Sequence, residues 1–320
     1  MKLAELKQKL KGVIIVNTTP FNRDGSLDLA SFRANLRWLL KRTEGKDFIF
    51  NPLGSTGEFY AMSDDECKAV IKTTAEEVNG KLPVFAGVGR PGTRETIKMC
   101  QYAESVGVDG VQVILPYYFI PTEEGAYQHY KQIAESIRIA VMVYNNPGPT
   151  GCWIKPALMA KIAKIDNIIA CKENTPNLTQ FVQMKKTVSP KNMTFFCGLG
   201  EEMYTNSAII GCAGVVSSYA NFIPDWTYAL YRAAETRDFT KMDATFEKMS
   251  PLVDFTAKVT GTTPGIGVSN PPPMYLPVVK AAMDIMGLKG GQPRLPLTGI
   301  STARKNELSE ILNSLKINGK

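Results

Sequence analysis

A lysine ends the short apolar run Asn167-Ile-Ile-Ala-Cys-Lys172. Such a run, with polar residues and a proline just beyond it, predicts a buried strand whose last residue is Lys172. Alternation along a strand predicts that Ile168, Ala170 and Lys172 share one face. Burial penalises the charged form of a lysine, so its pKa falls and the nucleophilic neutral amine becomes available near neutral pH. Taken alone, the run is more typical of a strand-end lysine that extends to water, so the rest of the chain must decide.

A tyrosine ends an earlier apolar run in the same way. Residues 139–144 predict a strand in which Met142 and Tyr144 share a face, so Tyr144 can lie beside Lys172 on the adjacent strand. A lysine amine attacks a carbonyl to form a Schiff base, and a phenol can move the protons. The protonated imine accepts electrons, so a C–C or C–O bond two atoms away can break without a metal. Because a phenol with a pKa near 10 is a poor base unaided, we expect Ser55 and a second tyrosine to relay its proton.

A loop with a glycine on each side of two hydroxyl residues follows the predicted strand at 48–51. Its sequence is Gly54-Ser55-Thr56-Gly57-Glu58. Exposed amides and hydroxyls in such a loop can hold a carboxylate. The loop is equally typical of a tight turn before a capped helix, and the box Ser63 to Glu66 predicts that helix.

Strand-like and helix-like segments alternate at the spacing of about 30 residues that βαβ units require. The predicted strands span 12–18, 48–51, 82–87, 110–115, 139–144, 167–172, 193–197 and 213–217. Eight units with strands apolar on both faces predict an α/β fold, a closed (β/α)8 TIM barrel. An open dinucleotide-binding sheet is disfavoured, because Thr18-Thr19-Pro20-Phe21 stands where its Gly-rich fingerprint would follow the first strand. In a barrel of this kind, the active site lies at the carboxyl ends of the strands.

The chain divides into two parts by pattern. We expect residues 1–236 to form the catalytic barrel and residues 237–320 a three-helix extension, with helices at 238–259, 274–287 and 300–315. Segments rich in Gly and Pro, at 261–265, 271–273 and 290–291, separate these helices. The extension carries no catalytic motif of its own, so we expect it to cover the barrel or to supply contacts between subunits.

Composition excludes several function classes. The 320 residues are 44% hydrophobic and 21% charged, which is typical of a soluble globular protein, and no apolar run is long enough to span a membrane or to serve as a signal peptide. The net charge of +7 is dispersed, without the basic stripe of a nucleic-acid-binding protein. Six cysteines without CxxC spacing predict reduced thiols and a cytoplasmic location. One histidine, His129, leaves no plausible zinc site, so we expect no metal and no cofactor.

Five motifs, in order and spacing, resemble those of the dihydrodipicolinate synthase / N-acetylneuraminate lyase family of class I aldolases and dehydratases. The resemblance covers essentially the whole chain. It is carried by the 54–58 loop, Pro116-Tyr-Tyr118, Tyr144-Asn-Asn-Pro147 with Thr150-Gly151, Lys172-Glu173 and Val215-Val216-Ser217.

The resemblance implies a role for each candidate residue. Lys172 would form the Schiff base with a 2-oxo acid, usually pyruvate, and Tyr144 would transfer protons above it. Ser55 and Thr56 would hold the carboxylate of the 2-oxo acid, and Val216 would place a backbone carbonyl near the imine. Tyr118 would cross a dimer interface to complete a relay of hydroxyl groups, in a homo-oligomer that is commonly a dimer of dimers.

One position departs from the synthase pattern. Dihydrodipicolinate synthases have an arginine that binds the carboxylate of the aldehyde, where this chain has Pro149, which offers neither charge nor donor. The resemblance then favours a lyase that makes or cleaves a C–C bond of a 3-deoxy-2-oxo sugar acid. Three alternatives stay open: a hydro-lyase or deaminating dehydratase with the same imine chemistry, a dihydrodipicolinate synthase, and a non-catalytic barrel that binds a ligand.

Overall fold

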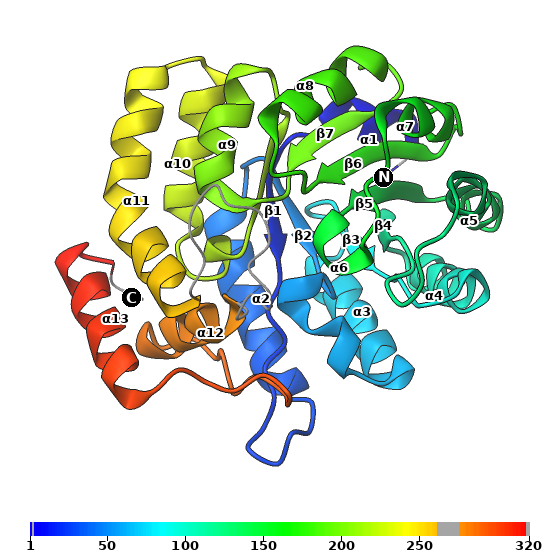
Figure 1. The fold of residues 1–320 in the computed structure, drawn as a ribbon. Coiled ribbons are helices and arrows are strands. Elements are labelled where there is room, and N and C mark those ends of the chain that lie inside the picture. The colour runs from blue at the N-terminus through cyan, green and yellow to red at the C-terminus, as the bar shows by residue number, and fades with distance from the viewer. Residues whose placement is uncertain (2, 261–274, 318–320) are drawn as a thin grey trace.

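The computed structural model describes residues 1, 3–260 and 275–317, and within them eight strands form one parallel sheet (Figure 1). The strand order is β2-β1-β8-β7-β6-β5-β4-β3, and a parallel bridge between Phe50 and Val84 joins the two ends of that order. The expected (β/α)8 barrel is therefore confirmed. The strands are β1 Gly12–Val16, β2 Phe48–Asn51, β3 Phe85–Gly87, β4 Gly110–Ile114, β5 Ala140–Asn145, β6 Ile168–Glu173, β7 Thr194–Cys197 and β8 Gly214–Ser217.

Helices surround the strands and alternate with them along the chain (Figure 1). The second of the expected helices begins at the predicted capping box, in which the Ser63 hydroxyl accepts from the Glu66 amide and the Glu66 carboxylate accepts from the Ser63 amide. The helices of the barrel are α1 Leu3–Lys9, α2 Leu29–Thr43, α3 Asp64–Val78, α4 Thr93–Ser105, α5 Glu123–Glu135, α6 Pro147–Thr150, α7 Pro156–Ile162, α8 Leu178–Thr187, α9 Gly200–Ile209 and α10 Pro224–Glu235.

Apolar side chains form two clusters, one between strands and helices and one inside the ring of strands. The inner cluster is closed at the amino-terminal end of the barrel by Leu6 of α1 and by Leu10. The sequence did not predict α1, because seven residues with few apolar positions give no clear periodicity. The inner cluster consists of Leu6, Leu10, Ile14, Val16, Ile49, Phe85, Ala140, Met142, Ile169, Ala170, Phe196 and Val216.

The alternation expected along β6 is wrong at its first residue. Ile168 lies in the outer cluster, whereas Ile169 and Ala170 both lie in the inner one. The physical reason is a register shift against β5, where Val141 pairs with Ile168 and Met142 pairs with Ala170, which leaves Ile169 without a partner as in a β-bulge. Beyond the shift, alternation resumes.

The extension contributes α11 Phe239–Thr260, α12 Leu276–Ile285 and α13 Thr302–Ser314. Its expected segments 261–265 and 271–273, and the first residue of the helix expected at 274, lie outside the described residues. Helix α12 packs onto the carboxyl ends of the first strands. There Lys280 forms a buried ion pair of 2.5 Å with Glu58 and donates to the carbonyl of Thr19, and the Thr18 hydroxyl contacts the Met283 sulfur at 3.1 Å. The extension therefore covers one side of the barrel mouth.

The helices and the cysteines relate to the expectations drawn from composition. Among the helices of the described residues, none is both long and apolar enough to cross a membrane. All six cysteines are free thiols.

Candidate active site

Lys172 and Tyr144 lie side by side at the carboxyl ends of β6 and β5. They are register partners in the parallel ladder, and the Lys172 amine lies 4.0 Å from the centre of the Tyr144 ring. Both side chains are buried. Lys172 has no carboxylate partner within the described residues, and burial lowers its pKa to about 7. The structure thus brings the predicted nucleophile and phenol together, and burial favours the neutral form of the amine.

The Tyr144 hydroxyl lies among polar side chains from three segments. The Asn146 amide donates to it at 2.8 Å, and Ser55 and Asn174 are further hydrogen-bonding neighbours that lower its pKa. Burial outweighs them and raises the pKa of Tyr144 to about 12. The phenol is therefore protonated near neutral pH. A donor aimed at a phenol oxygen stabilises the phenolate form of the group.

The loop after β2 places Ser55 and Thr56 at the mouth of the barrel. It forms a short 3-10 helix, η1 Ser55–Gly57, and Thr56 is buried. Gly54 is required there, because a Cβ at this position would come within 2.4 Å of the Val16 side chain. The Thr56 hydroxyl is 2.7 Å from the Tyr275 hydroxyl. The close approach of the loop to β1 thus positions Ser55 near Tyr144 and Thr56 near the extension.

The three other residues singled out in the sequence, Val216, Tyr118 and Pro149, differ in their burial and in where they lie relative to Lys172. Val216 lies in β8 with its side chain in the inner cluster. Tyr118 is 81% exposed and is not brought to Lys172 within one chain. Its predicted role requires a second subunit, so it stays a prediction. Pro149 lies in the short helix α6, exposed to solvent, and offers no positive charge to the site.

Several polar residues of the site were missed from the sequence. Asn146 belongs to the quoted Tyr144-Asn-Asn-Pro147 motif and Asn174 comes directly after Lys172-Glu173, and that proximity was an available signal. Tyr275 comes from the extension, about 100 residues further along the chain, and no local pattern indicates it. Nothing in the sequence indicates that Gly198 packs against the site. A Cβ at this position would lie 1.8 Å from the Asn174 side-chain oxygen and 2.9 Å from Lys172 Cγ.

Two buried carboxyl groups lie at the carboxyl ends of strands, since Glu173 ends β6 and Glu201 contacts Ser217, which ends β8. Glu173 follows Lys172 and accepts from the Asn145 side chain at 2.9 Å, and Glu201 accepts from the Ser217 hydroxyl. Burial raises the pKa of each to about 7. Glu173 points away from Lys172 along the strand, since successive strand residues face opposite sides. It therefore positions the ends of β5 and β6 through Asn145.

The single histidine is a packing residue. His129 of α5 is buried, its Nδ1 lies 2.9 Å from the Thr93 hydroxyl, and burial lowers its pKa to about 4. Across the described ranges, no group of three or more His, Cys, Asp or Glu side chains could hold a metal ion.

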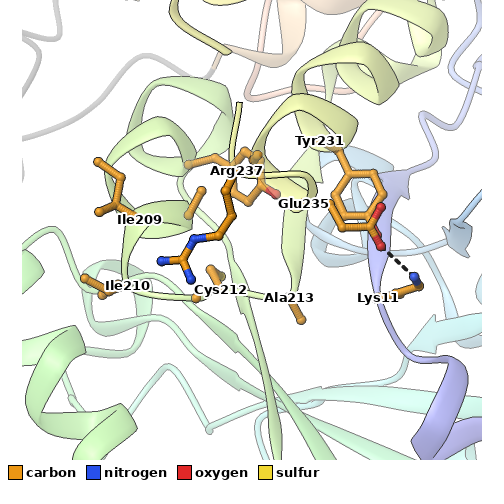
Figure 2. A pocket seen from close by; sticks show the side chains of 12 residues that line it. Lys11, Ile209, Ile210, Cys212, Ala213, Tyr231, Glu235 and Arg237 are labelled. Atoms are coloured by element: carbon orange, nitrogen blue, oxygen red, sulfur yellow. Dashed lines mark hydrogen bonds and ion pairs between the residues drawn. The ribbon is translucent and has the colours of Figure 1, made fainter. Parts of the chain in front are cut away.

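A pocket of about 530 Å³ lies at the opposite end of the barrel (Figure 2). Its lining includes Lys11 and Ala213, which directly precede β1 and β8, and Lys11 forms an ion pair with Glu235, which also lines it. None of the candidate residues lines it. Because Lys172 and Tyr144 stand at the carboxyl ends of their strands, this pocket is separate from the candidate active site.

Comparisons with known proteins identify a family. The sequence profile of the dihydrodipicolinate synthetase family matches residues 9–315. A 4-hydroxy-tetrahydrodipicolinate synthase of Archaeoglobus fulgidus is 33% identical over 96% of this chain and 99% of its own, and one of Acetivibrio thermocellus is 36% identical over 94% and 95%. The crystal structure of YagE, a prophage protein of that family from E. coli K12 in complex with pyruvate, is 28% identical and superposes with a TM-score of 0.85 over 96% of this chain and 99% of its own.

The depressed pKa of Lys172 predicts that this residue lowers the stability of the fold at neutral pH. The unfolded chain holds the proton up to about the ordinary value of 10.5, whereas the folded chain releases it near 7. Between these values the unfolded state binds more protons, so stability rises with pH. We expect Lys172→Met to stabilise the protein at pH 7, on the order of 3 kcal/mol, and the gain to shrink as the pH approaches 10.

Thermal unfolding of wild type and Lys172→Met at pH 7 and at pH 9.5 measures this difference. Lys186→Met, at an exposed lysine of α8, is the matched control and should leave the difference between the two pH values unchanged. An equal effect of Lys172→Met at both pH values would show that the amine keeps its ordinary pKa.

Proposed function

Because the chain belongs to the dihydrodipicolinate synthetase family of Schiff-base-forming enzymes, we propose that Lys172 forms an imine with pyruvate or another 2-oxo acid. We propose further that the enzyme is a lyase that makes or cleaves a C–C bond of a 3-deoxy-2-oxo sugar acid. The observation that carries the proposal is the buried Lys172 amine, with a pKa of about 7, beside the Tyr144 phenol.

The proposed reaction begins with attack of the neutral Lys172 amine on the C2 carbonyl, and loss of water gives the imine. In cleavage, the Tyr144 phenol passes its own proton to the Ser55 relay and, as a transient phenolate, takes the proton of the C4 hydroxyl. The C3–C4 bond breaks, and its electron pair enters the protonated imine to give an enamine and an aldehyde, while the proton held by the relay becomes available for C3. Protonation of the enamine at C3 and hydrolysis then release pyruvate and restore the amine. Asn146 supports the proton transfer by Tyr144, since its donation to the Tyr144 oxygen at 2.8 Å favours the transient phenolate.

Three further residues orient the 2-oxo acid in this proposal. Ser55 and Thr56 hold its carboxylate through the loop at the mouth of the barrel, and Ser55 also belongs to the proton relay of Tyr144. The Val216 backbone carbonyl lies near the imine. Their support is the placement of all three at the carboxyl ends of β2 and β8, which open on the same mouth as β5 and β6.

The exposed segment around Tyr118 supports a homo-oligomer. Tyr118, Phe119 and Ile120 are 81%, 79% and 66% exposed and follow one another in the chain. A contiguous apolar segment of this kind is typical of a protein–protein interface. We propose that two copies pair through this segment, that Tyr118 of each reaches the partner's relay, and that two such dimers assemble into a tetramer.

A dihydrodipicolinate synthase is the second candidate. The relatives described above have that activity in their names, at 33% and 36% identity. Against it stands Pro149, because neither this exposed residue nor the rest of the short helix α6 provides a cation for the carboxylate of an aldehyde such as aspartate-semialdehyde. The sugar-acid lyase is favoured for this reason.

Reduction with borohydride in the presence of pyruvate tests the imine. We expect mass spectrometry to show a reduced pyruvyl adduct on Lys172, with loss of activity, and no adduct in Lys172→Met. Tyr144→Phe should still form the adduct but lose most turnover, by about 100-fold or more, since general acid–base transfer contributes that much. Unmodified wild type, under conditions that label a control aldolase, would instead support a barrel that only binds ligands.

A substrate panel separates the reaction types. We expect pyruvate to be released from a 3-deoxy-2-oxo sugar acid, followed by chromatography of both products. Loss of water or ammonia without pyruvate would identify a dehydratase. Rapid condensation of pyruvate with aspartate-semialdehyde, and no reaction with sugar acids, would make the chain a synthase.

Sedimentation velocity tests the assembly. We expect the wild type to sediment as a dimer or tetramer, and Ile120→Glu to shift it to a smaller species, because a charge in an apolar interface is costly. Ile209→Glu is the matched control, since Ile209 of α9 is 53% exposed at the opposite end of the barrel. A monomeric wild type would contradict the role proposed for Tyr118.

A further inference from the structure

One face of α12 approaches the mouth of the barrel, and Tyr275 directly precedes this helix. Three contacts join the segment to the ends of β1 and β2. The Tyr275 hydroxyl lies 2.7 Å from the Thr56 hydroxyl, Lys280 pairs with Glu58 at 2.5 Å, and Met283 contacts Thr18 at 3.1 Å. Contacts at the middle and at the end of the helix therefore hold its first turn over the loop that carries Thr56.

Tyr275 also lies close to the reacting groups. Its hydroxyl contacts Thr56, and the charge that Tyr144 would carry as a phenolate acts on it. Burial raises the pKa of Tyr275 to about 12, so the phenol keeps its proton at neutral pH and can donate it in a hydrogen bond.

We propose that the Tyr275 hydroxyl, together with Thr56, binds the carboxylate of the 2-oxo acid, so that the extension supplies a substrate-binding residue. The inference rests on the proposed function, which assigns the carboxylate to the Ser55–Thr56 loop. It goes beyond that function by adding a donor from outside the barrel.

The chemistry of two adjacent hydroxyls supports this role. Each hydroxyl has one proton, so the bond between Tyr275 and Thr56 uses one proton and leaves the other free to donate. A carboxylate offers two oxygens that only accept, and each hydroxyl can turn its proton toward one of them. Hydrogen bonds to a charged acceptor are roughly twice as strong as those between neutral groups. Replacement of the bond between the two hydroxyls by bonds from both hydroxyls to the carboxylate is therefore favourable.

The alternative is that Tyr275 only holds α12 in place. The two roles differ in their dependence on the charge of the ligand. A residue that binds a carboxylate affects pyruvate and not a neutral carbonyl compound, whereas a residue that positions the loop or Tyr144 affects both.

The experiment measures the half-saturating concentration for borohydride trapping of the full-length protein, with pyruvate and with hydroxyacetone, which has no carboxylate. We expect Tyr275→Phe to raise the value for pyruvate about tenfold or more, as loss of one hydrogen bond to a charged group does, and to leave that for hydroxyacetone within about twofold. Tyr102→Phe is the matched control, because it removes a hydroxyl that donates to the Lys68 carbonyl on the outer helices. It should change neither value.

A double variant adds an independent readout. If both hydroxyls hold the same carboxylate, the effects of Thr56→Val and Tyr275→Phe on pyruvate trapping should not add. Equal losses with pyruvate and hydroxyacetone, or unchanged pyruvate trapping in Tyr275→Phe, would overturn the inference while the imine chemistry stands. Absence of any trapping in the wild type would overturn the proposed function and this inference with it.

Discussion

The chemistry proposed for this protein depends on the exclusion of one amine, that of Lys172, from water. Lys172 stands at the top of an apolar ring, with Ala170 and Phe196 among its inner neighbours, and no carboxylate of the described residues pairs with it. The cost of the charged form is therefore not offset, and the pKa falls to about 7. The same low polarity raises the pKa of Tyr144, so one environment favours both a neutral amine and a phenol that holds its proton. The packing of the barrel thus sets the protonation states of the site.

The shift of register between β5 and β6 makes this pairing possible. Val141 pairs with Ile168, and the skipped Ile169 lets Met142 pair with Ala170 and Tyr144 with Lys172. Without the shift, Tyr144 would pair with Cys171. The Lys172 amine and the Tyr144 ring would then point to opposite faces of the sheet. A local irregularity in a strand therefore decides which side chains meet at the carboxyl ends of β5 and β6.

Much of the fold could be predicted from sequence, because eight buried strands alternate with helices at a regular spacing. Lys172 and Tyr144 could be predicted for the same reason, since each ends an apolar run. Alternation could not reveal the skipped Ile169, because a β-bulge adds a residue without a sequence signal of its own. Tyr275 could not be predicted either, since its contact with Thr56 joins residues 219 positions apart. The role predicted for the exposed Tyr118 depends on a second chain, and the sequence of one chain does not show how two chains would meet.

The pair of Glu58 and Lys280 bears on how the molecule holds together. Both side chains are almost fully excluded from solvent, at 0% and 1% exposure, and one comes from the barrel and the other from the extension. Removing one partner of such a pair typically costs about 3–5 kcal/mol, because the other charge stays buried and alone. A fragment that ended after α10 would lack Lys280 and would leave the Glu58 carboxylate buried without its ion-pair partner, next to the loop of Ser55 and Thr56. We therefore propose that the boundary at residue 236 marks a change of chain pattern only, and that barrel and extension melt as a single cooperative body.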